Sequence, residues 1–149
     1  MPVRSYEEKD FDYLVEMDEK CFLHAWSPKN WESSLKMEQY RCYILEEHGT
    51  YQGFLLISEA LDEAEVLKIG VLEEYRGNAN GAKLLKRAFE QWKEDGIRTI
   101  FLEVRRSNVS ARTLYEKMNF EEIGVRKRYY KNPIEDAVLY SCQQFPLEL

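Results

Sequence analysis

Three extended, apolar runs follow one another in the middle of the chain, and their succession constrains the fold more than any other feature. They cover residues 41–45, 51–57 and 65–71, and a turn at 47–50 makes the first two a predicted hairpin. A helix is predicted at 81–94 and a strand at 99–104, so the third run opens a β-α-β unit. Hairpin strands followed by such a unit predict a mixed sheet with helices packed on it.

Shorter signals complete this pattern towards both ends of the chain. We expect a strand at 3–6 and a helix at 7–22, in which apolar residues keep a three-four spacing that only Asp18 interrupts. Ser27 and Pro28 form an N-cap followed by proline at the first helical position, which predicts a second helix. A short helix at 110–118 and strands at 120–125 and 137–141 follow. The predicted fold class is α/β, with a single domain over residues 1–149.

Composition and cysteine usage exclude several classes of protein. The chain is 44% hydrophobic, and no apolar run approaches the roughly 18–20 residues that a membrane span needs. The first eight residues lack the apolar stretch of a signal peptide. An odd number of cysteines without CxxC spacing argues against a disulfide framework, and two isolated histidines argue against a metal site. We therefore expect a cytoplasmic protein with no membrane association and no metal.

Charge is distributed unevenly along the chain. The net charge is −6, but residues 105–131 hold eight basic and three acidic residues, so that segment carries +5 and the remainder −11. The basic segment could meet an anionic ligand while the acidic remainder attracts a basic partner, although solvated faces alone would give the same pattern. The negative total disfavours a nucleic-acid partner.

The stretch at residues 66–85 carries the clearest functional signal. A strand runs into a loop of small residues, and a helix opens directly after it. The N-terminus of a helix offers unpaired N–H groups and the positive end of its dipole, which bind phosphate oxygens. The loop has neither the GxxxxGK[ST] of a P-loop nor the GxGxxG of a dinucleotide fold, and an ordinary β-α turn would look similar.

The loop YRGNANGA at residues 75–82 resembles the [Q/R]-x-x-G-x-[G/A] signature of the GCN5-related N-acetyltransferases (GNAT). In that family the loop and the next helix hold the pyrophosphate of acetyl-CoA. The resemblance implies the GNAT fold, a mixed and mostly antiparallel sheet of about seven strands flanked by four helices. At the fourth signature position Ala79 replaces glycine, and Asn80 stands where an apolar residue is usual. If residue 79 needs a positive φ, alanine costs roughly 1 kcal/mol there, which would weaken CoA binding.

Further motifs resemble one group of this family, the RimI-like ribosomal-protein alanine N-acetyltransferases. They are CF at 21–22 with AWS at 25–27, LEVRRSN at 102–108, LYEKMNF at 114–120 and YYKNPIEDA at 129–137. The resemblance covers roughly residues 3–140. It implies transfer of an acetyl group from acetyl-CoA to the α-amine of a protein, with the basic N-terminus of a small-subunit ribosomal protein as the expected acceptor. We expect a monomer or a weak homodimer.

The resemblance also implies roles for individual residues. Glu103 is the expected general base, acting directly or through water, and Tyr115 is the expected proton donor to the leaving thiolate. A backbone N–H around Ile69 to Val71 would stabilise the oxyanion. The expected cofactor-binding residues are Ile69, Gly70, Val71, Arg76, Gly77, Asn78, Ala79, Asn80, Gly81, Ala82, Asn108 and Tyr115, and the expected substrate-binding residues are Trp26, Glu103, Tyr129, Tyr130, Glu135 and Asp136.

Structural interpretations of the same residues stay open. Glu103 could be an ordinary strand glutamate, Tyr115 a core aromatic, and Asn108 the cap of the helix at 110–118. Gly70 either marks a bulge that splays its strand from the strand at 99–104 or simply weakens its own strand.

Two other functions also stay open. The first is acetylation of a different amine, such as a lysine side chain, a polyamine or a small molecule, because a fold does not determine its substrate. The second is a catalytically silent CoA-binding module, which only Ala79 and Asn80 favour. Trp26 would serve as a core or lid residue, and Glu135 and Asp136 could belong to a solvated turn.

Overall fold

The elements of the structure follow the predicted order. The computed structural model describes residues 2–77 and 79–143. The strands are β1 (Val3–Ser5), β2 (Tyr40–Glu47), β3 (Thr50–Ala60), β4 (Glu63–Val71), β5 (Thr99–Arg105), β6 (Glu121–Tyr130) and β7 (Glu135–Cys142). The helices are α1 (Phe11–Cys21), α2 (Pro28–Leu35), α3 (Asn80–Asp95) and α4 (Val109–Lys117). Helix α1 begins later than predicted, because the three residues before it form a 3-10 turn.

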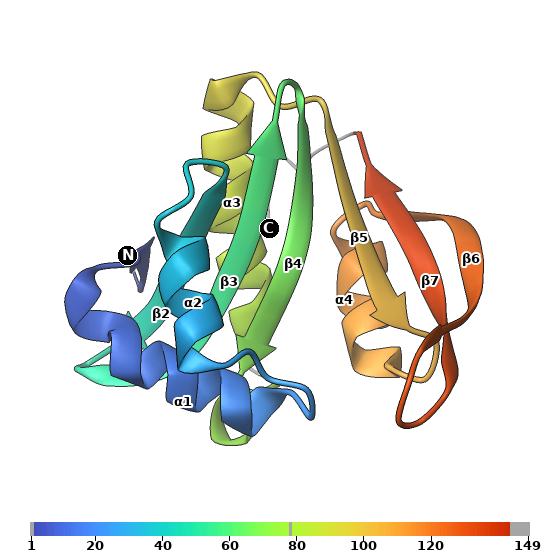
Figure 1. The fold of residues 1–149 in the computed structure, drawn as a ribbon. Coiled ribbons are helices and arrows are strands. Elements are labelled where there is room, and N and C mark those ends of the chain that lie inside the picture. The colour runs from blue at the N-terminus through green and yellow to red at the C-terminus, as the bar shows by residue number, and fades with distance from the viewer. Residues whose placement is uncertain (1, 78, 144–149) are drawn as a thin grey trace.

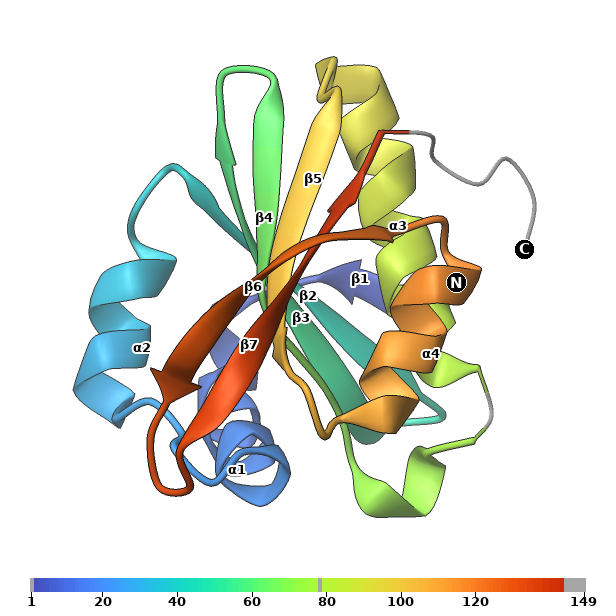
Figure 2. The same ribbon diagram turned by 90° about the vertical axis from the view of Figure 1, so that its right-hand side faces the viewer.

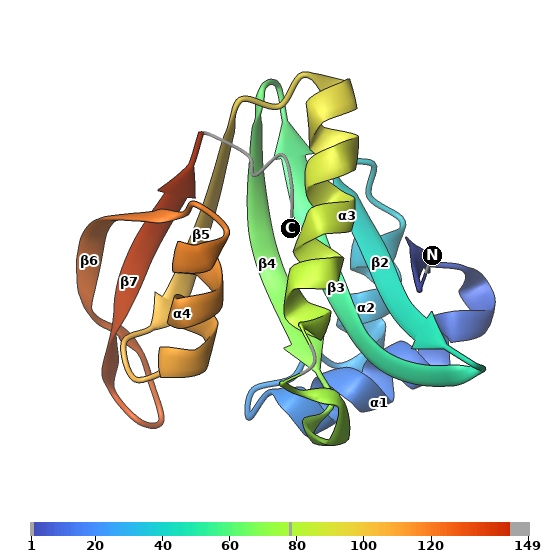
Figure 3. The same cartoon turned by 180° about the vertical axis from the view of Figure 1, so that it is seen from behind.

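The strands form one seven-stranded sheet in the order β1-β2-β3-β4-β5-β7-β6. All neighbouring strands are antiparallel except β4 and β5, which are parallel because α3 crosses between them. Helices α1 and α2 lie on one face of the sheet and α3 and α4 on the other (Figures 1 and 2). Seen from behind, α3 and α4 both lie in front of the strands (Figure 3). The predicted fold class, a mixed and mostly antiparallel sheet with four helices, is confirmed.

Each face of the sheet has its own hydrophobic core. Helix α3 buries its predicted apolar stripe, from Leu84 to Trp92, together with Tyr115 of α4. On the other face, Leu14 of α1 and Trp31 of α2 pack against Phe54 of β3. Because both faces are covered, residues 52–57 of β3 are all buried and form a continuous, largely apolar run.

The parallel ladder between β4 and β5 is short. It ends where Val66 pairs with Leu102. Beyond that point β4 keeps its pairing with β3 as far as Val71, and β5 keeps its pairing with β7 as far as Arg105. The two strands therefore diverge in the middle of the sheet (Figure 1). Beyond this point the facing edges of β4 and β5 do not pair with each other.

A β-bulge in β4 lies at this divergence. Val66 pairs with Ile57 and Lys68 pairs with Leu56, which makes Leu67 the extra residue. Leu67 and Lys68 consequently both face α1 and α2, whereas Val66 faces α3.

Of the two interpretations of Gly70 that the sequence leaves open, the bulge is wrong, because Gly70 pairs in regular register with Phe54. A Cβ at this position would lie 2.8 Å from the Phe54 ring and 3.1 Å from the side chain of Cys21. The glycine is required here because it lets the end of α1 lie directly against β4.

Arg4 in β1 and Asp10 before α1 form a buried network that fastens the first helix to the edge of the sheet. Both oxygens of Asp10 accept hydrogen bonds from the Arg4 guanidinium at 2.8 Å, and Oδ1 also accepts one from the Tyr51 hydroxyl at 2.6 Å. Burial alone would raise the pKa of Asp10. The hydrogen bonds from Arg4 and Tyr51 outweigh burial and hold this pKa at about 2.

Protonation of Asp10 should destabilise the protein at low pH. Because the folded-state pKa is lowered, the stabilisation is complete above about pH 4 and is lost as the pH falls towards 2, by about 2 kcal/mol. We expect urea unfolding to show this loss in the wild type, and Asp10→Asn to lack it. Asp12→Asn, an exposed position on α1, is the control. An Asp10→Asn profile parallel to that of the wild type would contradict the assignment.

Candidate active site

Glu103 lies where β4 and β5 diverge, one residue beyond the end of the parallel ladder. Its neighbours Leu102 and Val104 are buried in the core beneath α3 and α4. Glu103 therefore faces the opposite side of the sheet, as strand alternation predicts. Its side chain is 25% exposed, so the carboxylate is within reach of a ligand on this face.

Three further side chains surround the Glu103 carboxylate, and with it they form what we call the Glu103 cluster: Glu65, Glu103, Arg126 and Tyr129. Arg126 Nε lies 3.2 Å from Glu103 Oε1, and the Arg126 guanidinium is 5.4 Å from the centre of the Tyr129 ring. The charge of Glu103, then burial and a hydrogen bond to Glu103, raise the pKa of Tyr129. Burial and the charge of Glu103 raise the pKa of Glu65, while Arg126 opposes this.

Glu65 and Arg126 were missed by sequence reasoning. Glu65 belongs to β4 and Arg126 to β6, and only the strand order brings them to Glu103 on β5. An alternating polar position on each strand was the single available signal, and it is common to every solvent-facing residue of a sheet.

Tyr115 lies on the other face of the sheet from Glu103. It is 5% exposed and packs in the α3 and α4 core against Phe120 and Tyr140, at ring-centroid distances of 5.8 and 6.2 Å. Its hydroxyl has no hydrogen-bond partner among residues 2–77 and 79–143. Burial, and the charge of Tyr130, raise the pKa of Tyr115, so the phenol keeps its proton at neutral pH.

The segment from Ile69 to Val71 of β4 presents an open strand edge. It pairs with β3 on one side, whereas β5 has already left the ladder on the other. The side chains of Ile69 and Val71 pack against the same core as Tyr115. An extended ligand could therefore hydrogen-bond to this edge in the manner of an added strand, with Tyr115 on the same side of the sheet.

The loop after β4 leads into an uncapped helix. Gly77 and Ala79 both have positive φ, of 84° and 59°, and Ala79 is the N-cap of α3 but supplies no capping side chain. Ser27 caps α2 and Asn108 caps α4 with a side-chain oxygen. The N–H groups of the first turn of α3, like those of α1, have no side-chain cap and are left for another acceptor. Asn78, one of the expected cofactor-binding residues, lies outside the described residues.

The other residues of this loop make hydrogen bonds and packing contacts that hold it against β4 and α4. Arg76 Nε donates to the carbonyl of Val71 at 2.8 Å, and the buried Asn80 donates from Nδ2 to the carbonyl of Tyr75 at 2.8 Å. A Cβ on Gly81 would come within 2.8 Å of a methyl group of Leu114, so glycine allows α3 to begin next to α4. Ala82 packs against the same core. Asn80 therefore has a structural reason to replace the usual apolar residue.

Asn108 adopts the capping role that was left open. Its Oδ1 accepts a hydrogen bond from the N–H of Ala111 at 3.2 Å. Its Nδ2 donates to no other group within the described part of the chain. Because Asn108 is exposed, this amide nitrogen is accessible to solvent or to a ligand at the start of α4.

Trp26 belongs to the loop between α1 and α2, which a buried ion pair holds in place. Lys68 Nζ lies 2.8 and 3.0 Å from the two oxygens of Asp18, and Asp18 Oδ2 also accepts from the Trp26 N–H and from Trp31 Nε1. Burial lowers the pKa of Lys68, while Asp18 opposes this. Trp26 packs on Trp31 at 4.9 Å, which agrees with a core or lid residue.

The same α1–α2 loop also contacts the β6–β7 turn, where His24 Nε2 lies 3.4 Å from the carbonyl of Asn132.

Glu135 and Asp136 both accept backbone hydrogen bonds, Glu135 from the β5–α4 loop and Asp136 from its own hairpin. Glu135 accepts from the N–H of Ser107 at 2.6 Å and is paired with Arg105 at 3.3 Å. Asp136 accepts from the N–H of Arg128 at 2.9 Å. These hydrogen bonds lower the pKa of both carboxyls. The two residues fix the shape of the hairpin that carries Tyr129.

Tyr130 lies on the same hairpin, with the Arg105 guanidinium 4.5 Å from its ring. Burial, and then the charge of Glu103, raise its pKa to about 12. Tyr130 is thus a neutral, partly buried neighbour of the Glu103 cluster at physiological pH.

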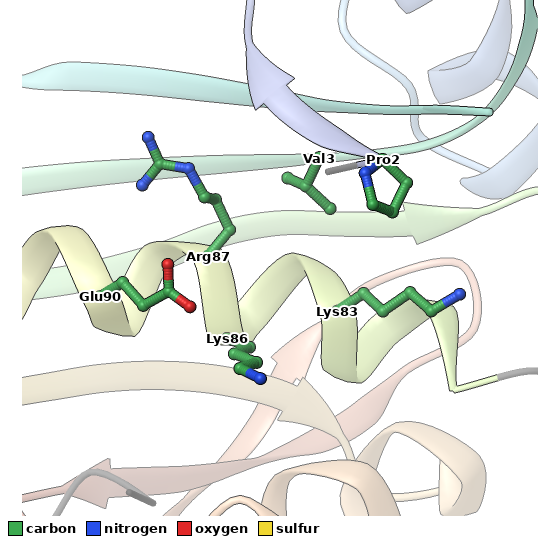
Figure 4. A pocket seen from close by; sticks show the side chains of 6 residues that line it. All are labelled: Pro2, Val3, Lys83, Lys86, Arg87 and Glu90. Carbon is green, nitrogen blue, oxygen red and sulfur yellow. The ribbon is translucent and has the colours of Figure 1, made fainter. Parts of the chain in front are cut away.

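A hollow of about 180 Å³ lies elsewhere, between β1 and α3 (Figure 4). It is lined by Pro2, Val3, Lys83, Lys86, Arg87 and Glu90. None of these is a predicted site residue, so we do not place the active site there.

Among residues 2–77 and 79–143 no group of His, Cys, Asp and Glu side chains could hold a metal ion. No helix in the described ranges is both long and apolar enough to cross a membrane.

Comparisons with known proteins agree with this fold. The acetyltransferase (GNAT) family model matches residues 11–120. The chain is 38% identical over 146 residues to the [ribosomal protein bS18]-alanine N-acetyltransferase of Haemophilus influenzae, which covers 94% of this chain and 97% of that protein. The crystal structure of the ribosomal-protein-S18-alanine N-acetyltransferase from Escherichia coli matches with a TM-score of 0.87 at 28% identity, over 99% of this chain and 97% of that one. A chain of the NatC complex, solved with Gag peptide and CoA, shares the fold at 20% identity and a TM-score of 0.81, over 97% and 99%.

Ala79 should be replaceable by glycine with a gain in stability. An alanine at φ 59° is strained by about 1–2 kcal/mol, and glycine would relieve this strain. Part of the gain is offset because glycine has more conformational freedom in the unfolded chain. We expect Ala79→Gly to raise the unfolding free energy by about 0.5–1 kcal/mol. Gly77→Ala, at φ 84° with no atom near its Cβ, is the matched control and should lower it by about 1 kcal/mol. Urea unfolding measures both, and a destabilised Ala79→Gly would contradict the strain.

Proposed function

The chain belongs to the acetyltransferase (GNAT) family, and from this premise we propose that it transfers the acetyl group of acetyl-CoA to the α-amine of a protein. The expected acceptor is the N-terminal alanine of a small-subunit ribosomal protein, in the cytoplasm. The observation that carries the proposal is the 38% identity, over nearly the whole of both chains, to an enzyme named as the alanine N-acetyltransferase of ribosomal protein bS18.

Acetyl-CoA supplies the acetyl group as a thioester, and two features of the chain fit this molecule. The uncapped start of α3 offers N–H groups to the pyrophosphate, with Arg76, Gly77, Asn78, Ala79, Asn80, Gly81 and Ala82 as the proposed binding residues. The open edge of β4, from Ile69 through Gly70 to Val71, offers backbone groups to the extended pantetheine arm. Asn108 Nδ2 would bind the same arm from the start of α4.

Glu103 is the proposed general base. An amine attacks a thioester only as the neutral base, so the acceptor must lose a proton before or during the attack. The carboxylate lies at the divergence of β4 and β5, on the face away from the α3 and α4 core, and its partial exposure gives an amine or a bridging water access. The proton passes from the acceptor nitrogen to Glu103, and the nitrogen forms the new bond to the acetyl carbon.

Tyr115 is the proposed proton donor on the other face. The bond between carbon and sulfur breaks, and the sulfur leaves with the electron pair. Burial raises the pKa of Tyr115, so the phenol is protonated at neutral pH and can donate a hydrogen bond to the sulfur as negative charge develops there. A backbone N–H between Ile69 and Val71 would stabilise the oxygen that gains negative charge during the attack.

Trp26 and the β6–β7 hairpin would border the acceptor. Tyr129, 47% exposed, and Tyr130 line the side on which Glu103 lies. Glu135 and Asp136 hold that hairpin in shape, and we assign them to acceptor binding through the surface they support.

A peptide experiment tests the acceptor. A peptide with the N-terminal sequence of the organism's own S18 protein is incubated with acetyl-CoA and the chain, and its intact mass is followed. The control is the same peptide with its α-amine blocked. One acetyl group gained by the free peptide alone supports the proposal. Acetylation of lysine-containing, polyamine or small-molecule acceptors instead would assign a different amine, and melting-temperature shifts with acetyl-CoA but no turnover would indicate a silent binding module.

Glu103→Gln should lose most of the turnover while keeping acetyl-CoA binding. A glutamine has nearly the same shape but cannot accept the proton, so we expect kcat to fall by about 10²–10³-fold with little change in the Kd for acetyl-CoA. The matched control is Glu63→Gln, an exposed carboxylate at the start of the neighbouring strand β4. Steady-state kinetics and calorimetry measure the two quantities. Full activity in Glu103→Gln would remove Glu103 from the base role.

A further inference from the structure

Arg126 is paired with the carboxylate that an acceptor amine would approach. Its Nε lies 3.2 Å from Glu103 Oε1, at the distance of an ion pair. An incoming α-ammonium group would be attracted to the same carboxylate, because it also carries a positive charge. The resident guanidinium and the acceptor therefore compete for Glu103 or share it.

The register of three strands places Arg126 there. Arg126 pairs with Ala137 and Glu103 pairs with Leu139, on the two edges of β7, so both side chains project from one face of the sheet. The small side chain of Ala137 leaves room for Arg126 to extend across β7 towards β5. Beyond Arg126 the β6 strand bulges, and Asp136 fixes the bulge through the Arg128 N–H.

The pair is weak enough to be exchanged. The side chains of Arg126 and Glu103 are 56% and 25% exposed, and ion pairs with this exposure add little stability. Glu65 adds a second carboxylate close enough for the charges of Glu103 and Arg126 to act on it. Two carboxylates against one guanidinium leave an excess negative charge, which suits the entry of one ammonium group.

We infer that Arg126 is a positioning residue for the acceptor amine: its positive charge beside Glu103 disfavours the ammonium form of the bound amine, which therefore loses its proton to solvent at a lower pH. This inference rests on the proposed function. The reason is electrostatic: an ammonium group beside the guanidinium is repelled by a like charge, whereas a neutral amine at the same place is not repelled.

Other groups around Glu103 modulate this effect. Glu65 on β4 favours the ammonium form and therefore opposes Arg126. Tyr129 and Tyr130 on β6 have raised pKa values and stay neutral in the pH range of the reaction. Lys68 on β4 faces the same side of the sheet, but its charge is balanced by Asp18. Arg126 is thus the cation of the cluster that acts against a charged acceptor.

The test is the pH profile of kcat in Arg126→Gln. Without the guanidinium the bound amine should hold its proton more tightly, so the rising limb of the profile should move upward by about one pH unit. At pH 7 kcat should then be about tenfold lower and should recover at higher pH, while KM for the acceptor falls because the ammonium form binds better. Arg126→Lys keeps the charge and should restore the limb.

Arg128→Gln is the matched control, since Arg128 is exposed on the same strand and its loss changes the net charge equally. An unmoved limb in Arg126→Gln, or an equal movement in Arg128→Gln, would overturn the inference. The profile requires only an amine that the chain acetylates. If the S18-type peptide is refused and a small amine is accepted, the proposed acceptor fails, and the Arg126 profile is then measured with that amine.

Discussion

The separation of β4 from β5 after Val66 and Leu102 is the constraint on which the rest of the structure depends. A continuous ladder would bury both edges and leave no place for an extended ligand in the middle of the sheet. Because the ladder stops, the edge of β4 is open, with Glu103 of β5 on one face of the sheet and Tyr115 of α4 packed in the same core as Ile69 and Val71 on the other. Glu103 on one face and Tyr115 on the other can then act on one ligand, which is what the proposed transfer requires.

Two sets of polar contacts hold the separated strands. On the β4 side, the bulge at Leu67 turns Lys68 towards α1, where Asp18 binds it inside a shell of aromatic rings. A buried pair of this kind adds little net stability, since desolvation offsets the attraction, but it leaves few alternatives for the position of the α1–α2 loop. On the β5 side, Glu135 ties the β6–β7 hairpin to the start of the β5–α4 loop.

Periodicity predicted the order of the elements, the buried apolar stripe of α3 and the face of Glu103, because these depend on neighbours in the sequence. The bulge at Leu67 was not predictable, since nothing in an apolar run marks which residue is left out of a ladder. The pair between Asp18 and Lys68 joins residues 50 positions apart, and Asp18 by itself only interrupts an apolar stripe. Arg126 was missed for the same reason, because its approach to Glu103 needs the register of three strands.

The most direct measurement is a crystal structure of the chain with a bisubstrate conjugate, in which CoA is linked through an acetyl group to the α-nitrogen of an S18-type peptide. The account predicts that the pantetheine amides bind the backbone of β4 between Ile69 and Val71. It predicts the sulfur beside Tyr115 and the peptide on the face of Glu103, between Trp26 and the β6–β7 hairpin. A conjugate bound with peptide and sulfur on one face, or in the hollow between β1 and α3, would contradict it.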